Sequence, residues 1–130
     1  MIPRTFQLRI DDTSEGVLAH VVGPLDVEHA PGVRERLMPH LRKATRIVVN
    51  LMRTDYVDSE GVRSLMALHR SAEAAHAELC LVLQPGSRAE RTFVLLRLKD
   101  HFRIHASVRD ALKPEQWPEA VDSERMAAMR

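Results

Sequence analysis

The sequence predicts a single α/β domain, in which a mixed, mostly parallel β-sheet with an N-terminal hairpin is flanked by amphipathic helices. Two observations predict this fold class. Short apolar runs rich in β-branched residues recur along the chain, as in strands covered on both faces. Amphipathic segments separate these runs, and this alternation is typical of βαβ units with right-handed crossovers. The expected order of elements is ββαβαβαβα, and a length of 130 residues suits one domain.

The predicted strands are short. Residues 6–10 alternate apolar and polar side chains, as in a half-buried strand, and residues 17–22 form the hairpin partner after a polar turn. Residues 46–51 and 79–83 are nearly continuous apolar runs, which predict buried strands. A last edge strand is expected at residues 102–105.

The first two predicted helices lie between these strands. Pro31 marks the start of the first, because proline is tolerated in the first turn of a helix, and Pro39 is expected to kink or shorten it. The second is expected over residues 60–76. The apolar stripe of the first helix consists of Val33, Leu37 and Leu41.

Two more helices are predicted in the last third of the chain. Ser87 and Glu90 have the spacing of a capping box, and Ser107 is the expected cap of a short final helix. The side chains expected to point inward from the third helix are Phe93 and Leu96, with Val94 and Leu95 as further candidates. The residues expected to share one core are Val48, Leu65, Leu81 and Phe93.

Composition and charge narrow the function classes. The chain has 19 basic and 18 acidic residues, so it lacks the basic excess typical of nucleic-acid-binding proteins. No stretch reaches the roughly 20 apolar residues that cross a bilayer, and the N-terminus becomes polar too early for a signal peptide. We therefore expect a cytoplasmic protein that does not insert into membranes. Cys80 lies in an apolar run and is expected to be a buried structural thiol.

The sequence predicts neither an enzyme nor a cofactor. Val57 stands where a nucleophile elbow around Ser59 would need glycine, and no phosphate-binding glycine loop is present. His69 and His76 share a predicted helix but lack acidic or cysteine partners at ligand spacing, so no metal site is expected. The acids at Asp55, Asp58 and Glu60 allow an acid–base pair, although a helix N-terminus favours acidic residues in any case.

The most distinctive segment is the turn Asp58-Ser59-Glu60-Gly61, between the central strand and the long helix. Asp58 is a natural N-cap, and Ser59 would stand in the first turn with its hydroxyl toward solvent. A phosphate on Ser59 would be held by the free backbone N–H groups there. From the spacing alone, the alternative that Ser59 is a second capping residue without a function is favoured.

The turn resembles the signature of the STAS domain of anti-sigma factor antagonists. In that family an apolar strand ending in Asp-Leu or Asn-Leu precedes an apolar residue and Asp-Ser-x-Gly, which corresponds to residues 47–51 and 57–61 here. The segment Gly23-Pro24-Leu25-Asp26 is similar to the Gly-x-Leu-Asp motif of the family. The resemblance covers roughly residues 6–112 and departs from the family pattern at Glu60 and Val62.

The resemblance implies a function. In the family, the serine after the motif aspartate is phosphorylated by a kinase that is also the anti-sigma factor, and this serine corresponds to Ser59. We therefore expect a STAS domain at residues 1–112, a tail at 113–130, and an anti-sigma factor kinase as partner. Trp117 is a candidate to hold this tail against the domain. The expected partner-binding and switch residues are Asp26, Asp58, Glu60 and Gly61.

The resemblance leaves one alternative open. Some STAS domains are subunits of lipid-trafficking transporters or of larger signalling assemblies. The sequence does not distinguish such a subunit from a phosphorylation-controlled antagonist, and it leaves the oligomeric state open.

Overall fold

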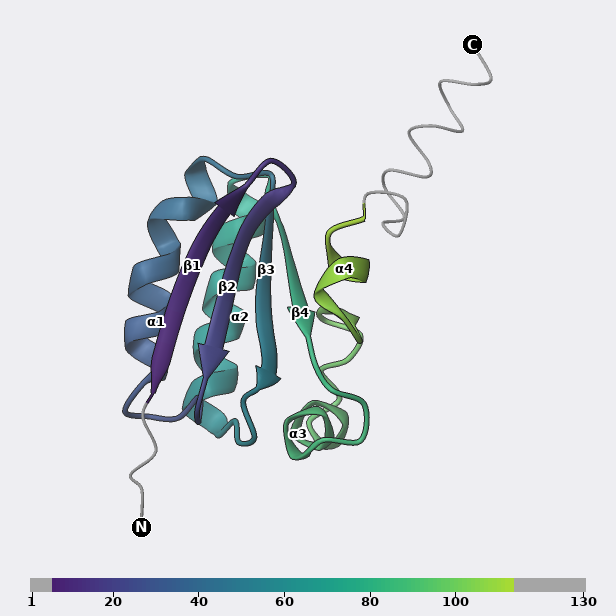
Figure 1. Cartoon of the computed structure of the whole chain (residues 1–130). Helices are drawn as coiled ribbons and strands as arrows, with labels where there is room; N and C mark the ends of the chain where they lie inside the picture. The colour runs from purple at the N-terminus through teal and green to yellow at the C-terminus, as the bar shows by residue number, and fades with distance from the viewer. Residues whose placement is uncertain (1–5, 114–130) are drawn as a thin grey trace.

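The computed structural model of the chain describes residues 6–113 (Figure 1). The predictions for Trp117 and for a tail from residue 114 onward lie outside the described residues. Within these residues, no helix is both long and apolar enough to cross a membrane. The elements in chain order are β1 (Gln7–Thr13), β2 (Gly16–Val22), α1 (Ala30–Leu37), the 3₁₀ helix η1 (Met38–Arg42), β3 (Arg46–Arg53), α2 (Ser59–Ala74), β4 (Glu78–Val82), α3 (Arg88–Leu95), β5 (Arg103–His105) and α4 (Val108–Ala111).

The strands form one mixed sheet in the order β1-β2-β3-β4-β5. The hairpin strands β1 and β2 are antiparallel, and every later neighbour pairs in parallel. This arrangement confirms the predicted fold class. The carboxyl ends of β2, β3 and β4 consequently meet at one edge of the sheet, so the loops that follow them lie at the same end of the molecule (Figure 1).

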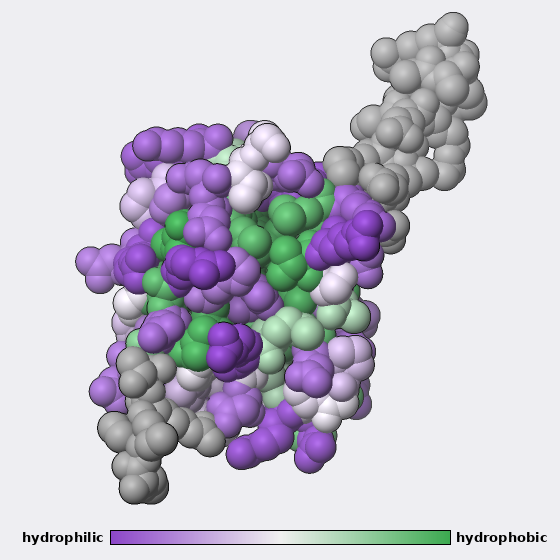
Figure 2. Space-filling view, viewed as in Figure 1, coloured by the Kyte–Doolittle hydropathy of each residue, from purple (hydrophilic) through white to green (hydrophobic). Residues whose placement is uncertain are grey.

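The two faces of the sheet are covered unequally. Helices α1 and α2 pack on one face, over the larger hydrophobic core, whereas α4 covers part of the other (Figure 1). Figure 2 is seen from this second face, where apolar residues gather beside α4 and polar residues lie over β1. The second face is therefore only partly apolar, and the main core lies under α1 and α2.

The grouping expected for the core is correct for Leu65, Leu81 and Phe93 but wrong for Val48. Val48 packs on the second face with Cys80, which is buried as expected. Successive side chains of a strand point to opposite faces, so Val48 cannot face the same helices as Val49. The error arises because a run that is apolar at every position does not indicate which residues share a face.

Helix α1 ends where proline was expected to disturb it. The α-helix stops at Leu37 and continues as a 3₁₀ helix that contains Pro39. The stripe residues Val33, Leu37 and Leu41 are all buried, as expected. Proline has no N–H to donate to the preceding turn, which explains the change of helix type at this point.

Helix α3 contradicts most of what was expected of its side chains. Phe93 is buried, but Leu96 is 52% exposed, and the further candidates Val94 and Leu95 are exposed as well. The helix ends at Leu95, and Arg97 adopts a left-handed conformation with φ of 56°. The N–H of Leu98 then donates to the carbonyl of Phe93 (2.8 Å), which is the Schellman arrangement. This reversal buries Leu98 in place of Leu96.

Several boundaries also differ from expectation, and β1 runs to Thr13, three residues past its expected end. Helix α2 ends at Ala74, and His76 lies beyond it with φ of 59°, so His69 and His76 do not share a helix. Strand β3 runs to Arg53, two residues past the expected end at Leu51. The longer β3 brings Met52 and Arg53 to the edge of the sheet, where the site described next is built.

Candidate functional site

The loop from β2 to α1 and the loop from β3 to α2 are joined by backbone pairing. The N–H of Leu25 donates to the carbonyl of Tyr56 (2.9 Å), and the N–H of Asp58 donates to the carbonyl of Leu25 (3.3 Å). Leu25 and Val57 form an isolated parallel bridge, and both side chains are buried. These contacts place the Asp26 segment directly beside the Asp58 turn.

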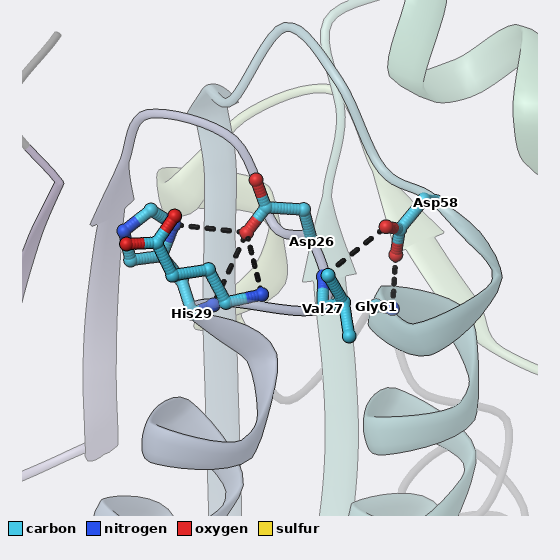
Figure 3. A network of polar contacts seen from close by, with 6 residues as sticks. Asp26, Val27, His29, Asp58 and Gly61 are labelled. Carbon is cyan, nitrogen blue, oxygen red and sulfur yellow. Dashed lines mark hydrogen bonds and ion pairs between the residues drawn. The ribbon is translucent and has the colours of Figure 1, made fainter.

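The Asp58 side chain makes hydrogen bonds both to the start of α2 and to the β2–α1 loop. It is the N-cap of this helix, as expected, and one carboxylate oxygen accepts from the N–H of Gly61 (2.9 Å). Its other oxygen accepts from the N–H of Val27 (3.1 Å) in the neighbouring loop (Figure 3). Asp58 therefore caps its own helix and also holds the β2–α1 loop, a role that its spacing in the sequence does not reveal.

Asp26 organises the start of α1. Its Oδ1 atom accepts from the N–H groups of Glu28 (3.2 Å) and His29 (3.1 Å) and lies 2.9 Å from Nδ1 of His29 (Figure 3). The His29 ring stacks on Phe6, with 4.2 Å between ring centroids. Because all these contacts are with groups two or three residues further along the chain, Asp26 acts first as a local turn residue for α1. The prediction that it takes part in partner binding stays a prediction.

Ser59 is the first residue of α2 and is exposed. Within residues 6–113, no group makes a hydrogen bond with its hydroxyl. The next residue, Glu60, forms an ion pair with Arg63 (2.7 Å) one turn along the helix. Ser59 thus presents a free hydroxyl at a helix N-terminus, where the backbone dipole favours a negative charge.

Gly61 is required by a close approach. An alanine Cβ at this position would stand 2.2 Å from the carbonyl oxygen of Leu25 and 2.9 Å from Cγ1 of Val57. The first turn of α2 packs so tightly on the paired loops that only glycine fits without a shift. Gly61 therefore fixes the distance between the helix that carries Ser59 and the β2–α1 loop.

Neither a general base nor a metal cluster accompanies Ser59 among the described residues. No base lies within hydrogen-bonding distance of the Ser59 hydroxyl among the described residues, so nothing activates it as a nucleophile. In the part of the chain that the structure describes, no three His, Cys, Asp or Glu side chains group closely enough to hold a metal ion.

A groove at the carboxyl ends of β2 and β3 was not predicted from the sequence. It has a volume of about 520 Å³ and lies between the end of β3 and the start of α3, with Met52, Arg53 and Arg88 among its lining residues. The guanidinium of Arg88 lies 5.7 Å from the centre of the Tyr56 ring. These residues are far apart in the sequence and belong to no motif, so only the fold brings them together.

Comparisons with known proteins agree with this architecture. An anti-sigma factor antagonist from Mycobacterium paratuberculosis has TM-score 0.73 at 18% identity, over 85% of this chain and 94% of that chain. The anti-sigma factor antagonist SpoIIAA in its unphosphorylated form has TM-score 0.64 at 24% identity, over 93% and 96%. The Bacillus cell fate determinant SpoIIAA in the phosphorylated form has TM-score 0.60 at 24% identity, over 92% and 98%.

At these identities the solved structures establish a shared fold. No curated protein matches the chain. The family model of the STAS domain matches residues 7–111, which is nearly all of the described region. The chain therefore belongs to the STAS domain family.

Proposed function

We propose that this protein is an anti-sigma factor antagonist that binds an anti-sigma factor kinase through the Asp58–Gly61 turn. Phosphorylation of Ser59 by that kinase ends the binding, so the protein regulates transcription indirectly, without contacting nucleic acid. The observation that carries the proposal is the exposed, unbonded hydroxyl of Ser59 at the N-terminus of α2. The domain comprises residues 1–112, with residues 113–130 as a tail, and it acts in the cytoplasm without catalysing a reaction.

The other serines near helix starts support the choice of Ser59. Ser87 and Ser107 use their hydroxyls as N-caps, accepting from the N–H groups of Glu90 and Asp110. Ser64 lies in α2 but is buried. A kinase needs an accessible serine hydroxyl, and Ser59 offers one without breaking a cap. The fold relative SpoIIAA, which has been solved in phosphorylated and unphosphorylated forms, supports the same mechanism.

The switch acts through the interface with the partner. A phosphate adds about −1.5 to −2 charges. These charges would stand next to Asp58 and Glu60, while the helix N-terminus holds the phosphate without unfolding. A partner surface that fits the neutral serine would have to bury this added charge, which is costly. Phosphorylation therefore lowers the affinity for the partner more than it lowers the stability of the fold.

The test uses the anti-sigma factor kinases encoded in the same genome, each purified and incubated with the protein and MgATP. Peptide mass spectrometry is expected to place one phosphate on Ser59, and Ser59→Ala is expected to stay unmodified. Titration calorimetry is expected to show tight binding of Ser59→Ala and weak binding of Ser59→Asp. Phosphate on another residue, with Ser59→Ala fully modified, would contradict the proposal.

A further inference from the structure

Exposed apolar side chains gather at one end of the molecule. Within residues 6–113, every large hydrophobic side chain that is exposed lies either in a segment that follows the carboxyl end of β2, β3 or β4 or, for Met52, in the last two residues of β3 itself. Ser59 lies at this same end. The residues are Val27, Met52, Tyr56, Val94, Leu95 and Leu96, and Leu95 is the most exposed of them at 75%. Exposed apolar residues that cluster in this way mark an interaction surface.

Helix α3 begins close to the loop that leads to the Ser59 turn. Figure 1 shows α3 beside the ends of β2 and β3, at the edge of the sheet where α2 begins. Tyr56 precedes the turn, and its ring contacts Arg88 at the start of α3. The groove lined by Met52 and Arg88 lies in the same region. A partner that covers Ser59 is thus close to the exposed side of α3.

The Asp58–Gly61 turn is too small to bind a protein alone. Only Ser59 of its four residues is exposed, since Asp58 and Glu60 are half-buried and Gly61 is buried. A specific protein interface involves about 20–30 residues on each side. The apolar anchors that such interfaces need are supplied here by the neighbouring loops and by the last turn of α3.

The two sides of this surface differ in charge. The side next to α1 and α2 carries the acids Asp26, Asp58 and Glu60, of which Glu60 is paired with Arg63, and Asp55 lines the groove between the two sides. The α3 side carries Arg88 and Arg91, which lie one turn apart on the helix, and no carboxylate among the described residues pairs with either. A partner that complements the α3 side presents acidic side chains around an apolar centre.

We infer that the exposed side of α3, formed by Arg88, Arg91 and Leu95, is the second half of the surface that binds the anti-sigma factor. The anti-sigma factor places apolar side chains against Leu95 and an acidic side chain against the two arginines. This inference rests on the proposed function and adds to it, because it assigns affinity to residues away from the phosphorylation site. Ser59 then controls whether the complex forms, and α3 supplies much of its binding energy.

The test compares Leu95→Asp and Arg91→Glu with Arg42→Glu. Arg42 is an exposed arginine at the end of η1, shortly before β3 begins, so it lies at the opposite end of the sheet. The probe is the purified anti-sigma factor kinase that binds the wild-type protein, measured by titration calorimetry. Both α3 variants are expected to lose at least about tenfold in affinity, while Arg42→Glu binds like wild type. Because Leu95 and Arg91 are exposed, thermal melts of all three variants are expected to match wild type.

The outcomes separate this inference from the proposed function. If both α3 variants bind like wild type while Ser59→Asp abolishes binding, the α3 inference is wrong and the proposed function stands. If no anti-sigma factor kinase binds the wild-type protein, both are wrong. If Leu95→Asp instead converts a dimer into a monomer in sedimentation, α3 faces a second copy of the chain, and the inference is also wrong.

Discussion

Replacing Gly61 by alanine tests the packing between the start of α2 and the β2–α1 loop. The added Cβ would stand 2.2 Å from the Leu25 carbonyl oxygen, whereas ordinary contact begins at 3.4 Å, so one segment must move by about 1 Å. The hydrogen bond from the Asp58 N–H to that oxygen is already 3.3 Å and would not survive the shift. Overpacking costs about 1–3 kcal/mol and the lost bond about 1 kcal/mol. Alanine regains up to about 1 kcal/mol of helix propensity.

The net expectation is a destabilisation of roughly 1–3 kcal/mol, measured by urea unfolding followed by circular dichroism. Gly32→Ala is the matched control, because Gly32 also lies in a helix but has no atom within 4 Å of an added Cβ. This control is expected to be stabilised by about 0.5–1 kcal/mol. A Gly61→Ala protein as stable as wild type would refute the claim that this glycine is required by close approach.

Four further predictions follow from the geometry. Asp58→Ala removes acceptors for two N–H groups and is expected to cost about 1–2 kcal/mol in urea unfolding, with a smaller loss for Asp58→Asn. Leu65→Ala, at a fully buried position, is expected to cost about 2–5 kcal/mol in the same assay. Burial lowers the pKa of His105, helped by Arg103 and Arg46 and opposed by Asp110, so the folded state prefers the neutral ring. The neutral His105 ring contributes its full share of stability above the ordinary histidine pKa of about 6.5, and this share is lost as the pH falls. His105→Gln should therefore flatten the pH dependence of the thermal midpoint between about pH 7 and 5. Phosphoserine incorporated at position 59 would stand four residues before Arg63, and its phosphate is expected to compete with Glu60 for the Arg63 guanidinium. Because a nearby positive charge favours the doubly ionised phosphate, Arg63→Gln should raise the midpoint of the ³¹P titration by about 0.3 pH units. An unchanged midpoint would contradict this pairing.

Local sequence patterns were sufficient to predict the helices and strands and their order along the chain. Pro31 and Pro39 indicate where α1 begins and where its α-helical part ends, because proline restricts the backbone wherever it occurs. Ser87 and Ser107 cap the helices they were expected to cap. The Glu90 side chain also reaches back, but it accepts from Gly86 (2.9 Å) and not from the N-cap residue. Features that depend on a few consecutive residues were therefore predictable.

Features that depend on tertiary contacts were not predictable. The side of the sheet that Val48 faces and the exposure of Leu96 are decided by register and by the reversal at Arg97. At the site, Asp58 was expected as a cap, but its bond to Val27 joins two loops whose proximity only the sheet creates. The contact between Tyr56 and Arg88 is likewise a product of the fold. No pattern in the sequence marks such pairs.

The central claim is that phosphorylation of Ser59 changes the affinity for an anti-sigma factor without unfolding the domain. The most direct measurement is titration calorimetry of the purified anti-sigma factor kinase against the unphosphorylated protein and against protein carrying phosphoserine at position 59. The account predicts at least a hundredfold weaker binding of the phosphorylated form, equivalent to about 2.8 kcal/mol, with thermal midpoints that differ by only a few degrees. Equal affinities of the two forms would contradict it.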